Sequence, residues 1–173
     1  YDSEGLLLLS NDPSLNYQLL QPRHGHEREY LVQVEGIPTE KALQSLRKGI
    51  SISIDGKHYT CKPAEAELVE IVQVPERQPP VRFRKNIPTT WMRLILSEGK
   101  NRQVRKMTAA TGFPTLRLIR TRIEKLELGN MEPGDVRSFS HKQINQLLFA
   151  SGRMPASKKP TVSYPAKPGK RRK

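Results

Sequence analysis

The 173-residue sequence contains a single cysteine, Cys61, and no apolar stretch approaching the length of a membrane-spanning helix. One thiol cannot form an internal disulfide, which excludes a disulfide-stapled secreted domain and fits a reducing cytoplasm. The apolar run from Gly5 to Leu9 is too short for a signal peptide and lacks preceding basic residues. The four histidines and the cysteine show no metal-ligand spacing, so no metal site is expected.

Acidic residues are also scarce, with 17 against 30 lysines and arginines, and the formal net charge is +13. The last 23 residues hold eight of these basic residues and no acid. Their Pro, Ser, Lys and Arg content leaves almost nothing to bury, which predicts a disordered basic tail over 151–173 after a domain over 1–150. The charge predicts a polyanionic partner, and composition alone leaves RNA, DNA and an anionic membrane surface open.

The N-terminal residues show a short apolar run followed by helical spacing. Leu6 to Leu9 are continuously apolar, which predicts a strand buried on both faces. Asp12 and Pro13 predict the start of a helix, because Asp is a good N-cap and Pro suits the first helical position. Pro22 predicts the end of this helix. Its expected buried residues are Leu15, Leu19 and Leu20.

Alternating apolar residues predict several strands in the middle of the chain. One of them places Tyr30, Val32 and Val34 on a single face. Asp55 and Gly56 are typical of a two-residue hairpin turn. The expected elements are strands over 29–35, 50–54, 58–61 and 66–72, a helix over 38–48 that buries Leu43 and Leu46 and ends at Gly49, and a last helix capped by Ser140.

The most informative stretch is WMRLILSEGKNRQVRKMTAATG, from Trp91 to Gly112. It predicts a strand over 91–96, a turn over 97–100 and a helix with Asn101 as its N-cap and Gly112 as its stop. Three cations share one helical face: Arg102, Arg105 and Lys106. A solvated basic face on an amphipathic helix is the simpler interpretation of these cations, so the sequence context must decide.

That context resembles the bacterial ribosomal RNA pseudouridine synthases of the Rsu type, and within them the branch that acts on the large ribosomal subunit. LSEGKNRQVRKM, from Leu96 to Met107, is similar to the family segment L-x-E-G-[RK]-x-[HR]-Q-[VI]-[RK]-[RK]-M. DSEGLLLLSND, from Asp2 to Asp12, is similar to the end of the family's catalytic segment. Further similarity lies at Gln21-Pro22, from Tyr30 to Pro38, from Pro80 to Trp91 and from Leu116 to Ile123.

The resemblance implies an α+β fold, with a mixed, mostly antiparallel sheet on which helices pack. It also implies an isomerase that converts a uridine in large-subunit (23S) ribosomal RNA to pseudouridine. The implied enzyme needs no cofactor or metal. It acts on RNA in the cytoplasm as a monomer without membrane attachment. The alternative is a non-catalytic RNA-binding or ribosome-assembly domain. A DNA-binding protein is disfavoured because no helix-turn-helix, zinc-finger or basic-zipper pattern is visible.

The resemblance also assigns roles to individual side chains. Arg105 matches the cation that pairs with the catalytic carboxylate, Tyr30 the ring that stacks on uracil, and Leu118 the apolar contact beneath the base. By the period-two rule, Arg120 and Arg122 are expected on the face of Leu118. The expected substrate-binding residues are Leu118, Lys100, Arg102, Gln103, Lys106, Arg120 and Arg122.

Two positions depart from the family pattern, and one expected residue lies outside the sequence. Asp2 matches the second, non-nucleophilic acid of the catalytic segment, which places the expected nucleophile just ahead of Tyr1. We therefore expect a fragment that lacks its N-terminal part and is inactive by itself. Arg28 replaces a Lys ahead of Tyr30, and Glu124 replaces a Gly, which puts the turn after the last long strand in doubt.

Overall fold

The computed structural model describes residues 4–70, 72, 74, 75, 77, 80, 84 and 87–149. Asp2 and the predicted tail over 151–173 lie outside these described residues. Within the described ranges, no helix has the length and apolar character that crossing a membrane requires.

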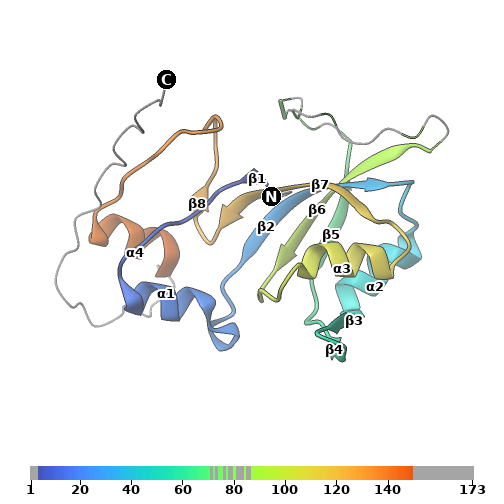
Figure 1. The fold of residues 1–173 in the computed structure, drawn as a ribbon, viewed down its shortest axis with the longest axis horizontal. Coiled ribbons are helices and arrows are strands. Elements are labelled where there is room, and N and C mark those ends of the chain that lie inside the picture. The colour runs from blue at the N-terminus through green and yellow to red at the C-terminus, as the bar shows by residue number, and fades with distance from the viewer. Residues whose placement is uncertain are drawn as a thin grey trace, which may run out of the picture.

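A single sheet with the strand order β1-β7-β2-β6-β5 organises the molecule (Figure 1). β1 runs parallel to β7, and every other pair in this sheet is antiparallel, including β8 with the end of β7. β3 and β4 form a separate hairpin. The mixed, mostly antiparallel sheet confirms the expected α+β class. The strands are β1 (Glu4–Gly5), β2 (Arg28–Glu35), β3 (Ser51–Ile54), β4 (Lys57–Thr60), β5 (Glu65–Val69), β6 (Thr89–Leu96), β7 (Thr115–Ile123) and β8 (Leu126–Glu127).

Local capping explains where the helices begin. The Asp12 carboxylate accepts from the Ser14 amide at 2.8 Å, and Pro13 occupies the first turn, as predicted. The Thr39 hydroxyl accepts from the Ala42 amide at 3.3 Å. Ser140 precedes the last helix as expected. The helices are α1 (Pro13–Leu20), the short 3₁₀ helix η1 (Pro22–His24), α2 (Glu40–Lys48), α3 (Gln103–Ala110) and α4 (His141–Phe149).

Two hydrophobic cores lie on the same face of the sheet. The larger core joins α2, α3 and the β3–β4 hairpin to Val32, Val34 and Leu118. The smaller core joins α1 and α4 to Ile123 and Leu126. In Figure 1 the pair α1 and α4 lies at the left and the pair α2 and α3 at the right, with β2 running between them. The sheet therefore carries two helical units side by side.

The apolar run near the N-terminus differs from the prediction. Only Glu4 and Gly5 pair in the sheet, and the prediction of a strand buried on both faces over Leu6 to Leu9 is wrong. Leu6 is buried, whereas Leu7 and Leu9 are exposed, because the chain leaves β7 after the bond from the Leu6 amide to the Arg120 carbonyl. Leu20 is also exposed, since Leu15 and Leu19 form the inward stripe of α1 and Leu20 lies a quarter turn away.

Candidate active site

The turn between β6 and α3 is anchored by a buried carboxylate, Glu98, which is only 1% exposed. Its Oε2 accepts from the Tyr59 hydroxyl at 2.6 Å, and its Oε1 accepts from the Lys62 amide at 2.9 Å and from Gln103 Nε2 at 2.5 Å. Burial alone would raise the pKa of the Glu98 carboxyl, but these three hydrogen bonds outweigh burial and lower the pKa below its usual value. Glu98 thus joins the turn to the β3–β4 hairpin.

Gln103 takes part in the same anchor. It is 3% exposed, its Nε2 donates to Glu98, and its Oε1 accepts from the Lys100 amide at 2.9 Å. An amide whose oxygen and nitrogen are both used inside the protein has little left to offer an RNA. The geometry therefore favours a structural role for Gln103 over the substrate contact that the sequence predicted.

Helix α3 begins differently from the prediction. Asn101 is not its N-cap; that position belongs to Arg102, which has a left-handed backbone (φ 52°) and makes no side-chain capping bond. Arg102 stands in a tight turn in which the Gln103 amide donates to the Lys100 carbonyl at 3.1 Å. The predicted stop is confirmed, because Gly112 follows the helix with φ 91° and its amide donates to the Ala109 carbonyl.

The same sheet face carries four residues along the edge of the larger core that faces the smaller one, and we name them the intercore strip: Arg28, Tyr30, Leu118 and Arg120. Leu118 belongs to the larger core and Tyr30 packs against it. Tyr30 is paired with Arg120 across the β2–β7 ladder, and Val32 with Leu118, so these side chains share one face. Arg28 Nη1 donates to the His26 carbonyl at 3.0 Å, and Nη2 donates to the Leu19 carbonyl. Burial lowers the pKa of the Arg28 guanidinium, and nearby Arg120 lowers it further.

The cations of α3 lie at one end of this strip. Arg105 is half-buried, and its Nη1 donates to the Thr115 carbonyl at the start of β7, at 3.3 Å. Arg102 is exposed and Lys106 half-exposed on the same helix. Lys100 lies toward the hairpin, with its Nζ 5.0 Å from the centroid of the Tyr59 ring. The structure thus separates the predicted cations into Arg105, near β7, and others that face outward.

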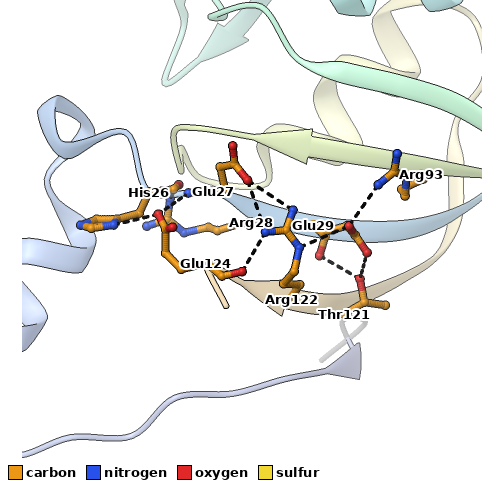
Figure 2. A network of polar contacts seen from close by, with 8 residues as sticks. All are labelled: His26, Glu27, Arg28, Glu29, Arg93, Thr121, Arg122 and Glu124. Carbon is orange, nitrogen blue, oxygen red and sulfur yellow. Dashed lines mark hydrogen bonds and ion pairs between the residues drawn. The ribbon is translucent and has the colours of Figure 1, made fainter. Parts of the chain in front are cut away.

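Arg122 lies elsewhere, and the prediction that it shares the face of Leu118 is wrong. An irregularity in β7 places Tyr30 opposite Arg120 but Glu29 opposite Arg122, so Thr121 is an extra residue that breaks the period of two. Figure 2 shows the result: Arg122 reaches Glu29 and Glu27 on the opposite face, at 3.4 and 3.3 Å. Arg93 also reaches Glu29, at 3.4 Å.

The turn after β7 keeps a glycine-like geometry without a glycine. Glu124 has a left-handed backbone (φ 51°), which non-glycine residues rarely adopt. Its carboxylate compensates for the strain, because Oε1 accepts from the Glu27 amide at 2.9 Å and lies 3.0 Å from His26 Nδ1 (Figure 2). The Arg122 Nη1 also donates to the Glu124 carbonyl, at 2.7 Å. The turn therefore forms even though Glu124 replaces the glycine of the family pattern.

Strand β1 is held against β7 by two features. A Cβ at Gly5 would lie 2.3 Å from the Arg120 carbonyl oxygen, so only glycine allows this close approach. Glu4 and Arg117 form a two-pronged ion pair, with distances of 2.9 and 2.8 Å. The Arg117 side chain is nearly buried and also donates to the Pro75 carbonyl. The segment that resembles the family's catalytic motif is thus fixed beside the intercore strip.

Comparison with known proteins agrees with this geometry. Residues 1–110 match the family model described as RNA pseudouridylate synthase. The chain belongs to this family. It is 49% identical over 133 residues to a Vibrio parahaemolyticus protein named ribosomal large subunit pseudouridine synthase E, covering 77% of this chain and 54% of the relative. It is 46% identical over 134 residues to the Xanthomonas axonopodis pv. citri protein of the same name, covering 77% and 68%.

A solved structure titled as a pseudouridylate synthase is similar in fold as well. It superposes with a TM-score of 0.64 at 26% sequence identity, covering 83% of this chain and 54% of that one. The chain therefore spans about half the length of the Vibrio relative and of this structure. Membership of the family is established over most of the chain.

Three features of this family member were missed from the sequence. Glu98 stands inside the recognised motif, but its partner Tyr59 is 39 positions away. Arg28 was noted only as a replacement for Lys, although it belongs to the intercore strip. The Glu4–Arg117 pair joins residues 113 positions apart, and no local pattern signals it.

Proposed function

We propose that this chain forms part of an enzyme that isomerises a uridine of large-subunit (23S) ribosomal RNA to pseudouridine. Family membership and the names of the relatives support this proposal. The observation that carries it is the intercore strip, where Tyr30 and the largely buried Leu118 lie on one sheet face beside the half-buried Arg120. An aromatic ring and an apolar side chain on one surface suit a base that must be gripped and turned.

The chemistry requires a few groups in a fixed arrangement. The N1–C1′ bond of the uridine breaks, the base turns, C5 bonds to C1′, and the proton that leaves C5 is balanced by one gained at N1. A carboxylate serves as nucleophile or electrostatic stabiliser. In the proposal Tyr30 stacks on the uracil, Leu118 supports it, and Arg105 keeps the carboxylate ionised. The atoms are only rearranged, so no redox or hydrolytic partner is part of the proposal.

The position of Arg105 supports its proposed role. Strands β1 and β7 are parallel, with Glu4 opposite Ile119, so the chain enters β1 from the side on which Thr115 lies. The Nη1 of Arg105 donates to the carbonyl of this same Thr115. In the family motif the nucleophilic Asp precedes β1, which brings it to the end of the strip that Arg105 occupies. Phosphate contacts are assigned in this proposal to Lys100, Arg102, Lys106 and Arg120.

The 173-residue chain by itself lacks the expected nucleophile. Asp2 matches the non-nucleophilic acid, and two residues along an extended chain correspond to roughly 6–7 Å. Reacting groups tolerate misplacements of only about 1 Å, so we propose that this chain binds RNA without isomerising uridine. We further propose that the whole enzyme acts as a monomer on ribosomal RNA in the cytoplasm.

Tritium release from large-subunit RNA that contains 5-tritiated uridine tests the proposal. A longer form that includes the Asp expected ahead of Tyr1 should release tritium, and the same form with that Asp changed to Asn should not. The 173-residue chain should bind the RNA and release none. Binding without release by every form would favour the alternative of a non-catalytic RNA-binding domain. Release by the 173-residue chain would implicate Asp2 as the nucleophile.

A further inference from the structure

An aromatic ring and a guanidinium stack on the surface of the smaller helical unit, outside the intercore strip. Tyr17 on α1 is 51% exposed, although large aromatic side chains usually bury most of their surface. The Cζ of Arg23, which lies in η1, is 5.6 Å from the centroid of the Tyr17 ring. Arg23 Nη2 donates to the Tyr17 hydroxyl at 2.7 Å. This second contact fixes the orientation of two side chains that would otherwise be mobile in solvent.

The charge of this pair is not neutralised by the protein. Among the described residues, Arg23 forms no ion pair, and its other contact is from Nε to the His24 Nε2 at 3.4 Å. Its guanidinium is exposed. A surface cation stacked on a tyrosine contributes little to folding, since exposed interactions of this kind are worth about 0.5–1 kcal/mol. The same two groups suit a nucleotide, because bases stack on aromatic and guanidinium planes and phosphates bind guanidinium.

The pair is connected to the proposed catalytic surface by a short path. Leu19 lies two residues after Tyr17 and is buried in the smaller core. Its carbonyl accepts from Arg28, a member of the intercore strip. The α1 helix therefore carries Tyr17 exposed to solvent, beside Arg23 of η1, while its Leu19 carbonyl contacts the strip. A single RNA strand that places one uridine on the strip would have neighbouring nucleotides within reach of α1.

We propose that Tyr17 and Arg23 form a stacking platform for an unpaired base of the substrate RNA that flanks the target uridine. Tyr17 supplies the ring on which the base lies, and Arg23 contacts the adjacent phosphate. This inference rests on the proposed function, because it takes RNA as the substrate. It adds a binding residue pair that is separate from the strip and from the cations of α3.

Fluorescence anisotropy with the 173-residue chain tests the platform. The probes are a short labelled oligouridylate and an oligomer of equal length with abasic riboses. Tyr17→Ala should weaken oligouridylate binding roughly 5- to 150-fold, the range expected for one stacked base, and leave binding of the abasic oligomer unchanged. Tyr17→Phe keeps the ring and should retain most of the affinity. Arg23→Met should weaken both probes, whereas Arg137→Met, at an exposed arginine of the loop before α4, serves as the matched charge control.

The outcomes separate the platform from the proposed function. Wild-type protein that binds oligouridylate no better than Tyr17→Ala would overturn the platform and leave RNA binding intact. Equal losses for both probes would also overturn it, because the contact would then be with the backbone. Failure of the wild-type chain to bind any RNA would refute the proposed function and the platform together. Melting temperatures of all variants should match the wild type, since both side chains are exposed.

Discussion

The buried carboxylate of Glu98 provides a quantitative test of how the strand–turn–helix unit is held. In Glu98→Ala the Lys62 amide and the Gln103 side-chain amide lose their acceptor, whereas the Tyr59 hydroxyl can turn toward solvent because Tyr59 is half-exposed. A buried donor left without a partner costs about 1–3 kcal/mol. The Gln103 amide is buried and the Lys62 amide is part of a half-buried bond. With these two donors and the lost packing, we expect the free energy of unfolding to fall by about 3–5 kcal/mol.

Glu98→Gln should be milder for a geometric reason. The amide oxygen can replace Oε1, which accepts two of the three hydrogen bonds, and the amide nitrogen can donate to the Tyr59 oxygen at the position of Oε2. Only the strengthening that the negative charge gives to these bonds is lost, so a decrease of about 1–2 kcal/mol is expected. Glu65→Gln, at an exposed acid on β5, is the matched control and should stay within about 0.5 kcal/mol of wild type.

Urea unfolding at several pH values measures how the contribution of Glu98 to stability depends on pH. The folded-state pKa of Glu98 is below its ordinary value of 4.5, so its stabilising contribution is present above that pH and is lost as the pH falls through the folded-state pKa. The difference between wild type and Glu98→Gln should therefore shrink in acid. Conversely, the hydrogen bond to Glu98 raises the pKa of Tyr59 to about 12, so that contribution is complete below about 10 and is lost as pH rises toward 12.

Two results would refute this account of Glu98. The first is a Glu98→Ala protein within about 1 kcal/mol of wild type, which would mean that the three hydrogen bonds contribute nothing net. The second is a difference between wild type and Glu98→Gln that stays constant from neutral pH to strong acid. That result would mean that the pKa of the Glu98 carboxyl is the same in the folded and the unfolded protein.

Three further predictions follow from the site and the sequence. In the longer enzyme form, Arg105→Met should lower the single-turnover rate by about two orders of magnitude or more, whereas Arg105→Lys should retain substantial activity. Arg102→Met should mainly weaken RNA binding. Glu124→Gly should change the free energy of unfolding by less than about 1 kcal/mol, because relief of the left-handed backbone strain offsets the lost hydrogen bonds. Glu124→Ala loses the same bonds without relief of strain and should cost about 2 kcal/mol in the same urea experiment. Deleting residues 151–173 should weaken RNA affinity and flatten its dependence on salt concentration, measured by anisotropy titrations.

Features encoded within a few neighbouring residues were predictable from the sequence. The Asp12 cap, the Asp55-Gly56 turn and the Gly112 stop each depend on hydrogen bonds or dihedral angles inside one short segment. The burial of Leu6 to Leu9 was not predictable from the sequence, because it depends on how far β1 stays paired with β7 and not on the composition of the run. The predicted start of α3 was also wrong, because the cap position falls on Arg102 in a left-handed backbone and not on Asn101.

The arginines of β7 show why side-chain type alone did not identify the site. Arg117 and Arg122 lie on one face of the strand, where they pair with Glu4, Glu27 and Glu29, and those acids neutralise their charge. Arg120 lies on the other face, and its Nε donates to the Leu6 carbonyl at 2.7 Å.

A carbonyl orients a guanidinium but leaves its net charge in place, and among the described residues neither Arg120 nor its neighbour Arg28 forms an ion pair. Uncompensated cations on one surface raise the local concentration of a polyanion, whereas paired cations do not. The extra residue at Thr121 decides which arginine belongs to which group, because it moves Arg122 to the acidic face and leaves Arg120 beside Tyr30. The β-bulge therefore places Arg122 on the face where Arg117 also pairs with acids, and it leaves on the other face Arg120, to which the proposed function assigns a phosphate contact.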